Sequence, residues 1–309
     1  MISGVFSSSP IFLTDLNATE QRISRDDQQI SSGVDVSVPS DDPADVPLLL
    51  DDQNQVAQIT QLVTNLQQQQ TITQTADGAL QTAASLLNQL ISLGTEGATA
   101  TATPTSNAVL AQQVQQIQQQ LVAIANTSVD GQYIFGGDDP STLPYTYDGS
   151  SSPNNDGVIG VTPAPTNTMT ITGLDGSSIT PGLTAGQIFE GQSGGPSNPV
   201  NVFQAVYQLG TALVGTSQTN IQTAVTTLQS AADYLNQCAA VYGDNENWLQ
   251  QQITTANSRS TLLTGEIGNL RDTDVANVAT DMSQAQVALE AALSAEASLP
   301  TKSLFSYLG

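Results

Sequence analysis

The chain contains no histidine and a single cysteine, Cys238, among its 309 residues. The absence of histidine excludes Ser-His-Asp and Cys-His catalytic arrangements and every histidine-based metal site. A lone cysteine excludes an internal disulfide. No GxGxxG, P-loop or paired-cysteine motif is present. We therefore expect no enzyme, no cofactor and no metal site.

Basic residues are almost as rare. Five Lys and Arg residues stand against 28 Asp and Glu residues, which gives a formal net charge of −23, and none lies between Asp26 and Ser258. Because phosphates and anionic lipids are both bound by clustered basic side chains, we expect no nucleic-acid partner and no anionic membrane partner. Acidity of this kind favours solubility and repulsion between exposed faces.

Long apolar runs are also missing. No run of about 18 apolar residues occurs, so we expect no membrane insertion. Residues 1–17 contain no Lys or Arg, and Ile11-Phe12-Leu13 is too short for the apolar region of a secretory signal. Sec-dependent export is therefore not expected, whereas export by a system with another signal stays open.

The C-terminal half instead carries an apolar stripe whose spacing alternates between three and four residues. Its members are Ile221, Val225, Leu228, Ala232, Leu235, Ala239, Tyr242, Leu249, Ile253, Ala256, Leu263, Ile267 and Leu270, followed by Val275, Val278, Met282, Ala285, Leu289, Ala292 and Leu299. A helix of about fifty residues is about 75–80 Å long. We expect this stripe to pack along other helices, from the same chain or from neighbours.

The N-terminal half repeats the pattern in three segments. The first, within residues 1–35, has Leu16, Ile23 and Ile30 at sevenfold spacing and ends at Gly33, which is typical of a helix C-cap. Asp42 before Pro43 is typical of a helix start, although Pro47 favours a slightly later one.

The next helix carries polar residues, Gln69 and Thr73, in the middle of an apolar seam. The apolar members of that seam are Ile59, Leu62, Leu66, Ala76, Leu80, Ala83, Leu87 and Leu90. Polar seam residues weaken a coiled coil locally and can fix its register. We predict a loop over 94–107. A third helix then carries Leu110, Val114, Ile117, Leu121 and Ile124 beneath a surface of glutamines.

The middle of the chain changes character. Residues 138–200 contain most of the prolines and many Gly, Ser, Thr and Asn residues. Strands are predicted at 131–137, 157–161 and 169–172. Asp175-Gly176, between Ile171 and Ile179, predicts a hairpin turn. Because the helical pattern resumes near 201–213, we predict a small β-rich insertion between two helical halves.

Acidic pairs are the strongest candidates for chemistry. Asp41-Asp42, Asp51-Asp52 and Asp138-Asp139 could bind calcium or act as acid and base. None matches an EF-hand loop, and two of the pairs precede a proline, which favours capping or turn roles. Asp272-Thr273-Asp274 is interpreted as the cap of a helix that restarts at Val275.

Aromatic residues gather near the insertion. Tyr133, Phe135, Tyr145 and Tyr147 could line a carbohydrate-binding surface, but packing within a small β unit is the favoured interpretation. Cys238 lies beside the C-terminal seam and is interpreted as a small core residue rather than a nucleophile.

Several motifs resemble those of bacterial flagellins and flagellar hook-associated proteins. They are Ile30-Ser31-Ser32-Gly33, Pro39-Ser40-Asp41-Asp42-Pro43-Ala44, Ala76-Asp77-Gly78-Ala79-Leu80, Ala125-Asn126-Thr127, Gly131-Gln132-Tyr133-Ile134-Phe135-Gly136-Gly137, Gly265-Glu266-Ile267, Asp272-Thr273-Asp274-Val275-Ala276, Met282-Ser283-Gln284-Ala285-Gln286 and Leu304-Phe305-Ser306-Tyr307-Leu308. The resemblance covers approximately residues 1–137 and 200–309. The insertion is unmatched.

With the stripes, this resemblance implies a mainly α fold: an elongated bundle of long coiled-coil helices from both chain ends, with a small β-rich insertion in the middle. The expected domains are an assembly helix and turn (1–45), two halves of a helical rod (46–137 and 201–272), the variable insertion (138–200) and a second assembly helix (273–309).

The resemblance further implies a structural subunit of the bacterial flagellum. Ser40-Asp41-Asp42-Pro43, the Tyr-x-Phe-Gly-Gly ending at Gly137 and the terminal Tyr307-Leu308 are more similar to the hook–filament junction branch of the family. A filament-forming flagellin is the alternative. The implied partners are copies of the chain itself, flagellin, a neighbouring hook-associated protein and an export chaperone on the C-terminal helix. The implied location is the extracellular flagellum, reached through the flagellar export apparatus.

Stripes at 1–35 and 275–308 cannot be fully buried within one chain, so we expect them to form the assembly interface. The expected interface residues are Leu16, Ile23, Ile30, Val275, Val278, Met282, Ala285, Leu289, Leu299, Leu304 and Leu308. Two alternatives stay open: a secreted ligand-binding or enzymatic insertion carried on a helical stalk, and an unrelated coiled-coil adaptor.

Overall fold

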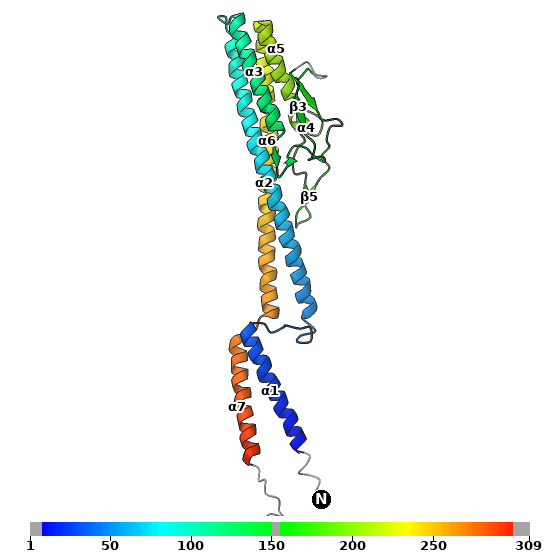
Figure 1. Cartoon of the computed structure of the whole chain (residues 1–309), viewed down its shortest axis with the longest axis vertical. Helices are drawn as coiled ribbons and strands as arrows, with labels where there is room; N and C mark the ends of the chain where they lie inside the picture. Colours follow the sequence, from blue (N-terminus) through cyan, green and yellow to red (C-terminus); the bar gives the residue numbers. More distant parts are fainter. Residues whose placement is uncertain (1–7, 150–154, 299–309) are drawn as a thin grey trace, which may run out of the picture. The chain divides into compact units, whose positions relative to one another are not determined.

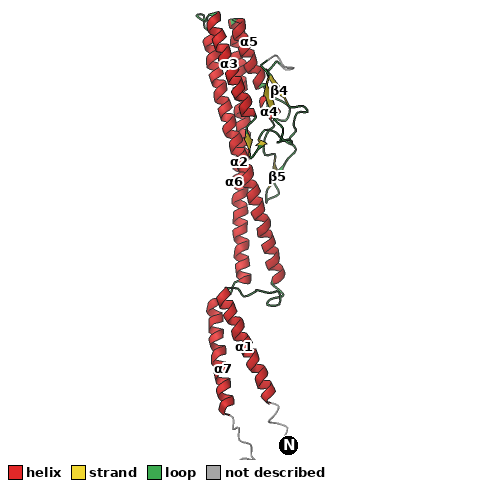
Figure 2. Ribbon diagram, in the orientation of Figure 1, coloured by secondary structure: helices red, strands yellow, loops and turns green. Residues whose placement is uncertain are grey.

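The structure is a computed structural model that describes residues 8–149 and 155–298. Over these residues the chain is mainly α-helical, with short strands near its middle (Figure 2). The predicted fold class, long helices from both halves of the chain with a small β-rich insertion, is confirmed. The chain forms two compact units. We call residues 61–257 the central unit, and residues 1–60 with 258–309 the terminal unit.

Four helices meet in the central unit (Figure 1). They are α2 (Val46–Gly97), α3 (Pro104–Ala125), α5 (Val202–Gly215) and α6 (Gln218–Arg271), of which α2 and α6 continue into the terminal unit. Most of their predicted stripe residues form one buried cluster, in which Leu87, Leu121 and Leu235 are fully buried. A second, smaller cluster contains Leu66, Leu249 and Ile253. Gln74 of α2 also donates to Glu246 of α6 at 2.7 Å.

The connection between α2 and α3 is shorter than predicted. The loop expected over 94–107 is wrong at both ends, because α2 continues to Gly97 and α3 begins at Pro104. A Cβ atom at Gly94 would lie only 2.5 Å from Val225 Cγ2, so glycine lets α2 approach α6 closely. Tertiary packing thus overrides the weak helix propensity of glycine. Thr103 caps α3 by accepting from Ser106 N at 3.1 Å.

Strands begin at Ser128, before the 138–200 segment, so from here on we call residues 128–200 the insertion. Its described residues contain three short antiparallel strand pairs. These pairs are β1 (Ser128–Val129) with β2 (Gln132–Tyr133), β3 (Tyr145–Tyr147) with β4 (Val158–Gly160), and β5 (Ile171–Thr172) with β6 (Ser178–Ile179). Ile171 pairs with Ile179, and Gly176 adopts a φ of +79°, so the hairpin predicted at Asp175-Gly176 is confirmed. The strand predicted over 131–137 is only two residues long, because Phe135 turns into the core.

Aromatic side chains of the insertion pack against the helices. Phe135 contacts Phe189 of α4 (Ala185–Phe189) edge-on, with ring centroids 6.0 Å apart, and Tyr145 contacts Phe203 of α5 at 5.0 Å. The packing interpretation of Phe135 and Tyr145 is confirmed, since both are buried. Asn201 caps α5 by accepting from Gln204 N at 2.8 Å, which agrees with the helix predicted near 201–213.

Cys238 is fully buried in the same core. Burial raises the pKa of its thiol to about 12. Because the thiolate is the reactive form, a thiol with this pKa is unreactive at neutral pH. The core-packing interpretation of Cys238 is confirmed.

In the terminal unit, α1 (Ser8–Ser32) packs against α7 (Val275–Ser298). Gly33 ends α1 with a φ of +71° and donates to Gln29 O at 2.8 Å, which confirms the predicted C-cap. The next residues pair with the end of α6, since Asp35 N donates to Arg271 O at 2.7 Å.

Side-chain caps begin the following helices of this unit. The Asp42 carboxylate accepts from Asp45 N at 3.2 Å, just before α2 starts at Val46. The Asp274 carboxylate accepts from Ala276 N at 3.1 Å, so the predicted cap of the helix at Val275 is confirmed. Within the two described ranges, none of the helices is long and apolar enough to cross a membrane.

Candidate functional site

The predicted interface residues that the structure describes lie on α1 and α7. They are Leu16, Ile23, Ile30, Val275, Val278, Met282, Ala285 and Leu289; we call them the terminal stripe. Since α1 and α7 pack against each other, the two helices are neighbours within one chain. Leu299, Leu304 and Leu308 lie outside the described residues.

The terminal stripe is only incompletely buried. Of its eight residues only Ala285 is buried, with 6% of its surface exposed, whereas Val275 is 46% exposed. Leu16, Ile23 and Leu289 are partly buried. Two helices can cover each other along one line only, so the flanks of each apolar face stay open.

A surface groove runs between the two helices at the middle of this stripe. Its volume is about 410 Å³, and Ile23, Met282 and Leu289 all line it. The structure therefore brings apolar residues from opposite ends of the chain into one groove, whose other lining residues are polar: Glu20, Ser24, Asp27 and Gln286.

A second apolar surface on α7 escaped the sequence analysis. Val287 is 66% exposed and forms a shallow groove with Ala288 and Ala291. Leu293 on the same helix is 49% exposed. These residues lie outside the three-four stripe, and only their high exposure in the structure distinguishes them from core residues.

Charges beside the terminal stripe are poorly matched. Arg22 and Asp281 form an ion pair at 3.9 Å with both side chains about half exposed, a geometry that contributes little. Asp26 is only 5% exposed, and its Oδ2 has no hydrogen-bond partner among the described residues. Asp26 lines a polar cavity of about 670 Å³ together with Arg22 and Arg25. Sequence pattern gave no indication that Asp26 is buried.

Two of the three acidic pairs serve turns, whereas the turn or cap role expected for Asp51-Asp52 is wrong, because both residues lie within α2. Asp41 accepts from the amides of Ser37 and Val38, and these backbone hydrogen bonds lower the pKa of its carboxyl group. Asp138 accepts from Thr166 and Thr168, which lower its pKa in the same way. Among the described residues, no group of three or more Asp, Glu or Cys side chains is arranged to hold a metal ion.

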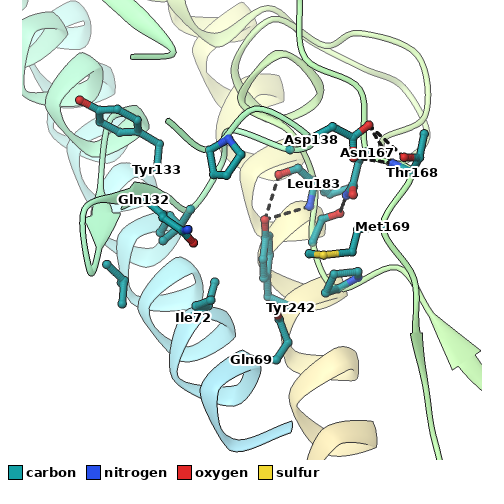
Figure 3. A pocket seen from close by; sticks show the side chains of 16 residues that line it. Gln69, Ile72, Gln132, Tyr133, Asp138, Asn167, Thr168, Met169, Leu183 and Tyr242 are labelled. Atoms are coloured by element: carbon teal, nitrogen blue, oxygen red, sulfur yellow. Dashed lines mark hydrogen bonds between the residues drawn. The ribbon is translucent and has the colours of Figure 1, made fainter. Parts of the chain in front are cut away.

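The central unit contains a separate cavity of about 520 Å³ where the insertion covers α2 and α6 (Figure 3). Gln69 and Tyr133, both singled out by the sequence analysis, line this cavity. Asn167 and Met169 were missed, because the irregular path of the insertion follows no periodic pattern.

Comparisons with known proteins agree with the fold. Residues 7–139 match the family model of the bacterial flagellin N-terminal helical region. A structure described as a flagellar hook-associated protein from Vibrio parahaemolyticus is similar with a TM-score of 0.64 and 16% identity, over 75% of this chain and 100% of that one. FlgL from Bacillus cereus is similar with a TM-score of 0.54 and 17% identity, over 72% and 100%. A search of curated protein sequences finds no significant match. The resemblance to the flagellin family is thus confirmed.

Proposed function

We propose that this chain is a structural subunit of the bacterial flagellum, of the hook-associated protein 3 type, and that it joins the hook to the filament. The flagellin N-terminal region at residues 7–139 supports a flagellar role. The similarity to a hook-associated protein and to FlgL supports the junction assignment over that of a filament flagellin.

The incomplete burial of the terminal stripe is the observation that carries this proposal. Completing the burial of a partly buried Leu, Ile or Met side chain contributes roughly 0.5–1 kcal/mol. Several such side chains on α1 and α7 together offer neighbouring subunits a few kcal/mol per contact. Assembly would then stabilise the two helices, in the way that any partner binding the folded state does. Head-to-tail repetition of this contact gives an open helical polymer.

The proposed partners follow from the same surfaces. Copies of this chain, flagellin and a neighbouring hook-associated protein would cover the terminal stripe. Before assembly, an export chaperone would shield α7, whose exposed Val287 and Leu293 otherwise face water. We propose export through the flagellar apparatus and a final position in the extracellular flagellum.

Charged substitutions in the terminal stripe test the proposal. In cells that carry only the variant protein, we expect Met282→Asp with Leu289→Asp to leave hooks without filaments, because a buried carboxylate opposes the contact. Flagellin should then collect in the medium. Electron microscopy of the cells and immunoblots of the medium measure both effects.

A matched control is Gln222→Asp with Gln229→Asp, at two exposed positions on α6 in the central unit. It adds the same two negative charges and should leave filaments of normal number and length. Filaments of normal number and length on cells that carry only the Met282→Asp, Leu289→Asp variant would refute the proposal. If the variant lacked filaments and no other flagellin appeared in the medium, the chain would be the filament protein itself.

A further inference from the structure

The cavity of the central unit has the size and walls of a small-molecule site. Its volume of about 520 Å³ falls within the roughly 300–1,000 Å³ typical of ligand pockets. Figure 3 shows Gln69 and Ile72 on α2, Tyr242 on α6, and Met169 and Gln132 from the insertion around one opening. All the lining residues belong to the central unit.

The apolar seam of α2 is interrupted at this cavity. Leu66 and Ala76 on either side are buried at 1% and 0% exposure, but Gln69 and Thr73 take the seam positions between them. Thr73 is fully buried, and its hydroxyl has no hydrogen-bond partner among the described residues. The interruption therefore places one polar seam residue, the half-buried Gln69, in the lining of the cavity, whereas Thr73 does not line it.

Two carboxamides at the cavity also lack internal partners. The side chains of Gln69 and Gln132 line the cavity and make no hydrogen bond within the described part of the chain. By contrast, Gln70, the next residue of α2, donates to Gln250 of α6 at 2.9 Å. A glutamine beside the seam can therefore find a partner on α6, whereas the carboxamides of Gln69 and Gln132 at the cavity stay available to a ligand.

The charges around the cavity argue against an anionic ligand. No Lys or Arg occurs in the central unit, so an anion would meet only acidic groups. The one carboxylate in the lining, Asp138, already accepts from Thr166 Oγ1 at 2.7 Å and from Thr168 N at 3.0 Å. Calcium sites use several oxygen ligands, often more than one carboxylate, so a lining with one carboxylate suits a neutral ligand better.

The remaining walls combine apolar faces with the polar residues Tyr133, Asn167 and Thr168. The Tyr242 hydroxyl accepts from Leu183 N at 2.9 Å, so the cavity meets its ring rather than a free hydroxyl. Ile72 and Met169 line the same opening, and Met169 is 53% exposed. The site thus combines apolar surfaces with two carboxamides that each offer a donor and an acceptor.

We propose that this cavity binds a neutral carbohydrate. Neighbouring hydroxyl groups of a sugar can donate to one carboxamide oxygen and accept from the other carboxamide nitrogen. The apolar face of the sugar ring would pack on Ile72 and Met169. A purely apolar ligand would leave Gln69 and Gln132 unpaired, and buried unpaired polar groups oppose binding.

Saturation-transfer NMR and calorimetry on the full-length chain test this site with glucose, galactose, N-acetylglucosamine and maltose as probes. We expect at least one of these sugars to bind. Gln69→Leu restores the apolar seam, so the fold should persist while sugar affinity falls at least about tenfold. Gln132→Leu, at an exposed position, should weaken the same sugar without affecting folding.

The matched control is Gln112→Leu, an exposed glutamine on α3 that does not line the cavity, and it should bind like the original chain. Absence of binding by every sugar at 50 mM, or equal binding by Gln69→Leu, would overturn the proposal. Benzyl alcohol serves as a neutral apolar probe, and tighter binding of benzyl alcohol than of any sugar would also overturn it. None of these outcomes bears on flagellar assembly, so the two proposals fail independently.

Discussion

Similar apolar stripes are buried to different extents in the central and the terminal unit. In the central unit, Leu87, Leu121 and Leu235 are fully buried, because four helices and the insertion surround them. In the terminal unit, Leu16 and Leu289 stay partly exposed between only two helices. Spacing along the chain therefore indicates which face is apolar, whereas the number of neighbouring elements decides how far that face is buried.

The two units differ in charge as well. All five basic residues lie in the terminal unit, where Arg22 and Arg271 form ion pairs with Asp281 and Asp272. In the central unit, every charged residue is acidic. The terminal unit nevertheless holds 16 of the 28 acidic residues, so both units are strongly acidic, and charge repulsion alone does not decide where copies make contact.

Truncating one leucine in each unit should give the largest contrast. Leu87→Ala removes a fully buried side chain, and we expect it to lower the free energy of unfolding of the central unit by about 2–5 kcal/mol. Leu289→Ala should lower the free energy of unfolding of the terminal unit by less than about 1.5 kcal/mol, because Leu289 is only partly buried. Urea unfolding followed by circular dichroism measures both. Equal losses would contradict the difference in burial.

Hydrogen exchange should sharpen the same contrast without any substitution. In dilute protein, we expect amides of α1 and α7 to exchange at least about 100-fold faster than those of α3, because fewer buried contacts oppose local opening. Assembly should slow the exchange of α1 and α7 and leave α3 unchanged. Mass-spectrometric exchange before and after assembly tests this, and strong protection of α1 in the dilute protein would argue against an assembly role.

Much of the helical framework could be predicted from local sequence. The three-four stripes placed α2, α3 and α6, and Gly33 and Asp274 marked helix ends through their capping chemistry. These features depend on residues within one or two turns, so they are visible in sequence.

Features that depend on distant neighbours were harder to predict. The continuation of α2 through Gly94 is explained by close contact with Val225, more than a hundred residues away. Gln118 was counted among the surface glutamines, yet it is 2% exposed and donates to the backbone of Asp156. The cavity beside Gln69 could not be foreseen, because the irregular insertion closes it.

The smallest expected effect concerns a buried acid in the central unit. Burial raises the pKa of Glu190 above its usual value near 4.5, the nearby Asp156 raises it further, and Gln192 opposes the shift by donating at 2.7 Å. The folded state therefore binds this proton more tightly than the unfolded state does. Its contribution to stability is present below about pH 4.5 and is lost as the pH rises through the folded pKa. Hydrogen bonds lower the pKa values of Asp138 and Asp175, so their contribution to stability has the opposite pH dependence. It is present above about pH 3.8 and is lost as the pH falls below that value.

Glu190→Gln removes this charge and should raise the melting temperature of the central unit at pH 7 by about 1–3 °C. Between pH 7 and pH 4.5, the variant should also gain less stability on acidification than the original chain. Glu96→Gln, at an exposed position on α2, is the matched control and should keep the original pH dependence. Thermal melts at several pH values make the measurement. A lower melting temperature of Glu190→Gln at pH 7 would contradict this prediction, because it would mean that the hydrogen bond from Gln192 outweighs the cost of partly burying the Glu190 carboxylate.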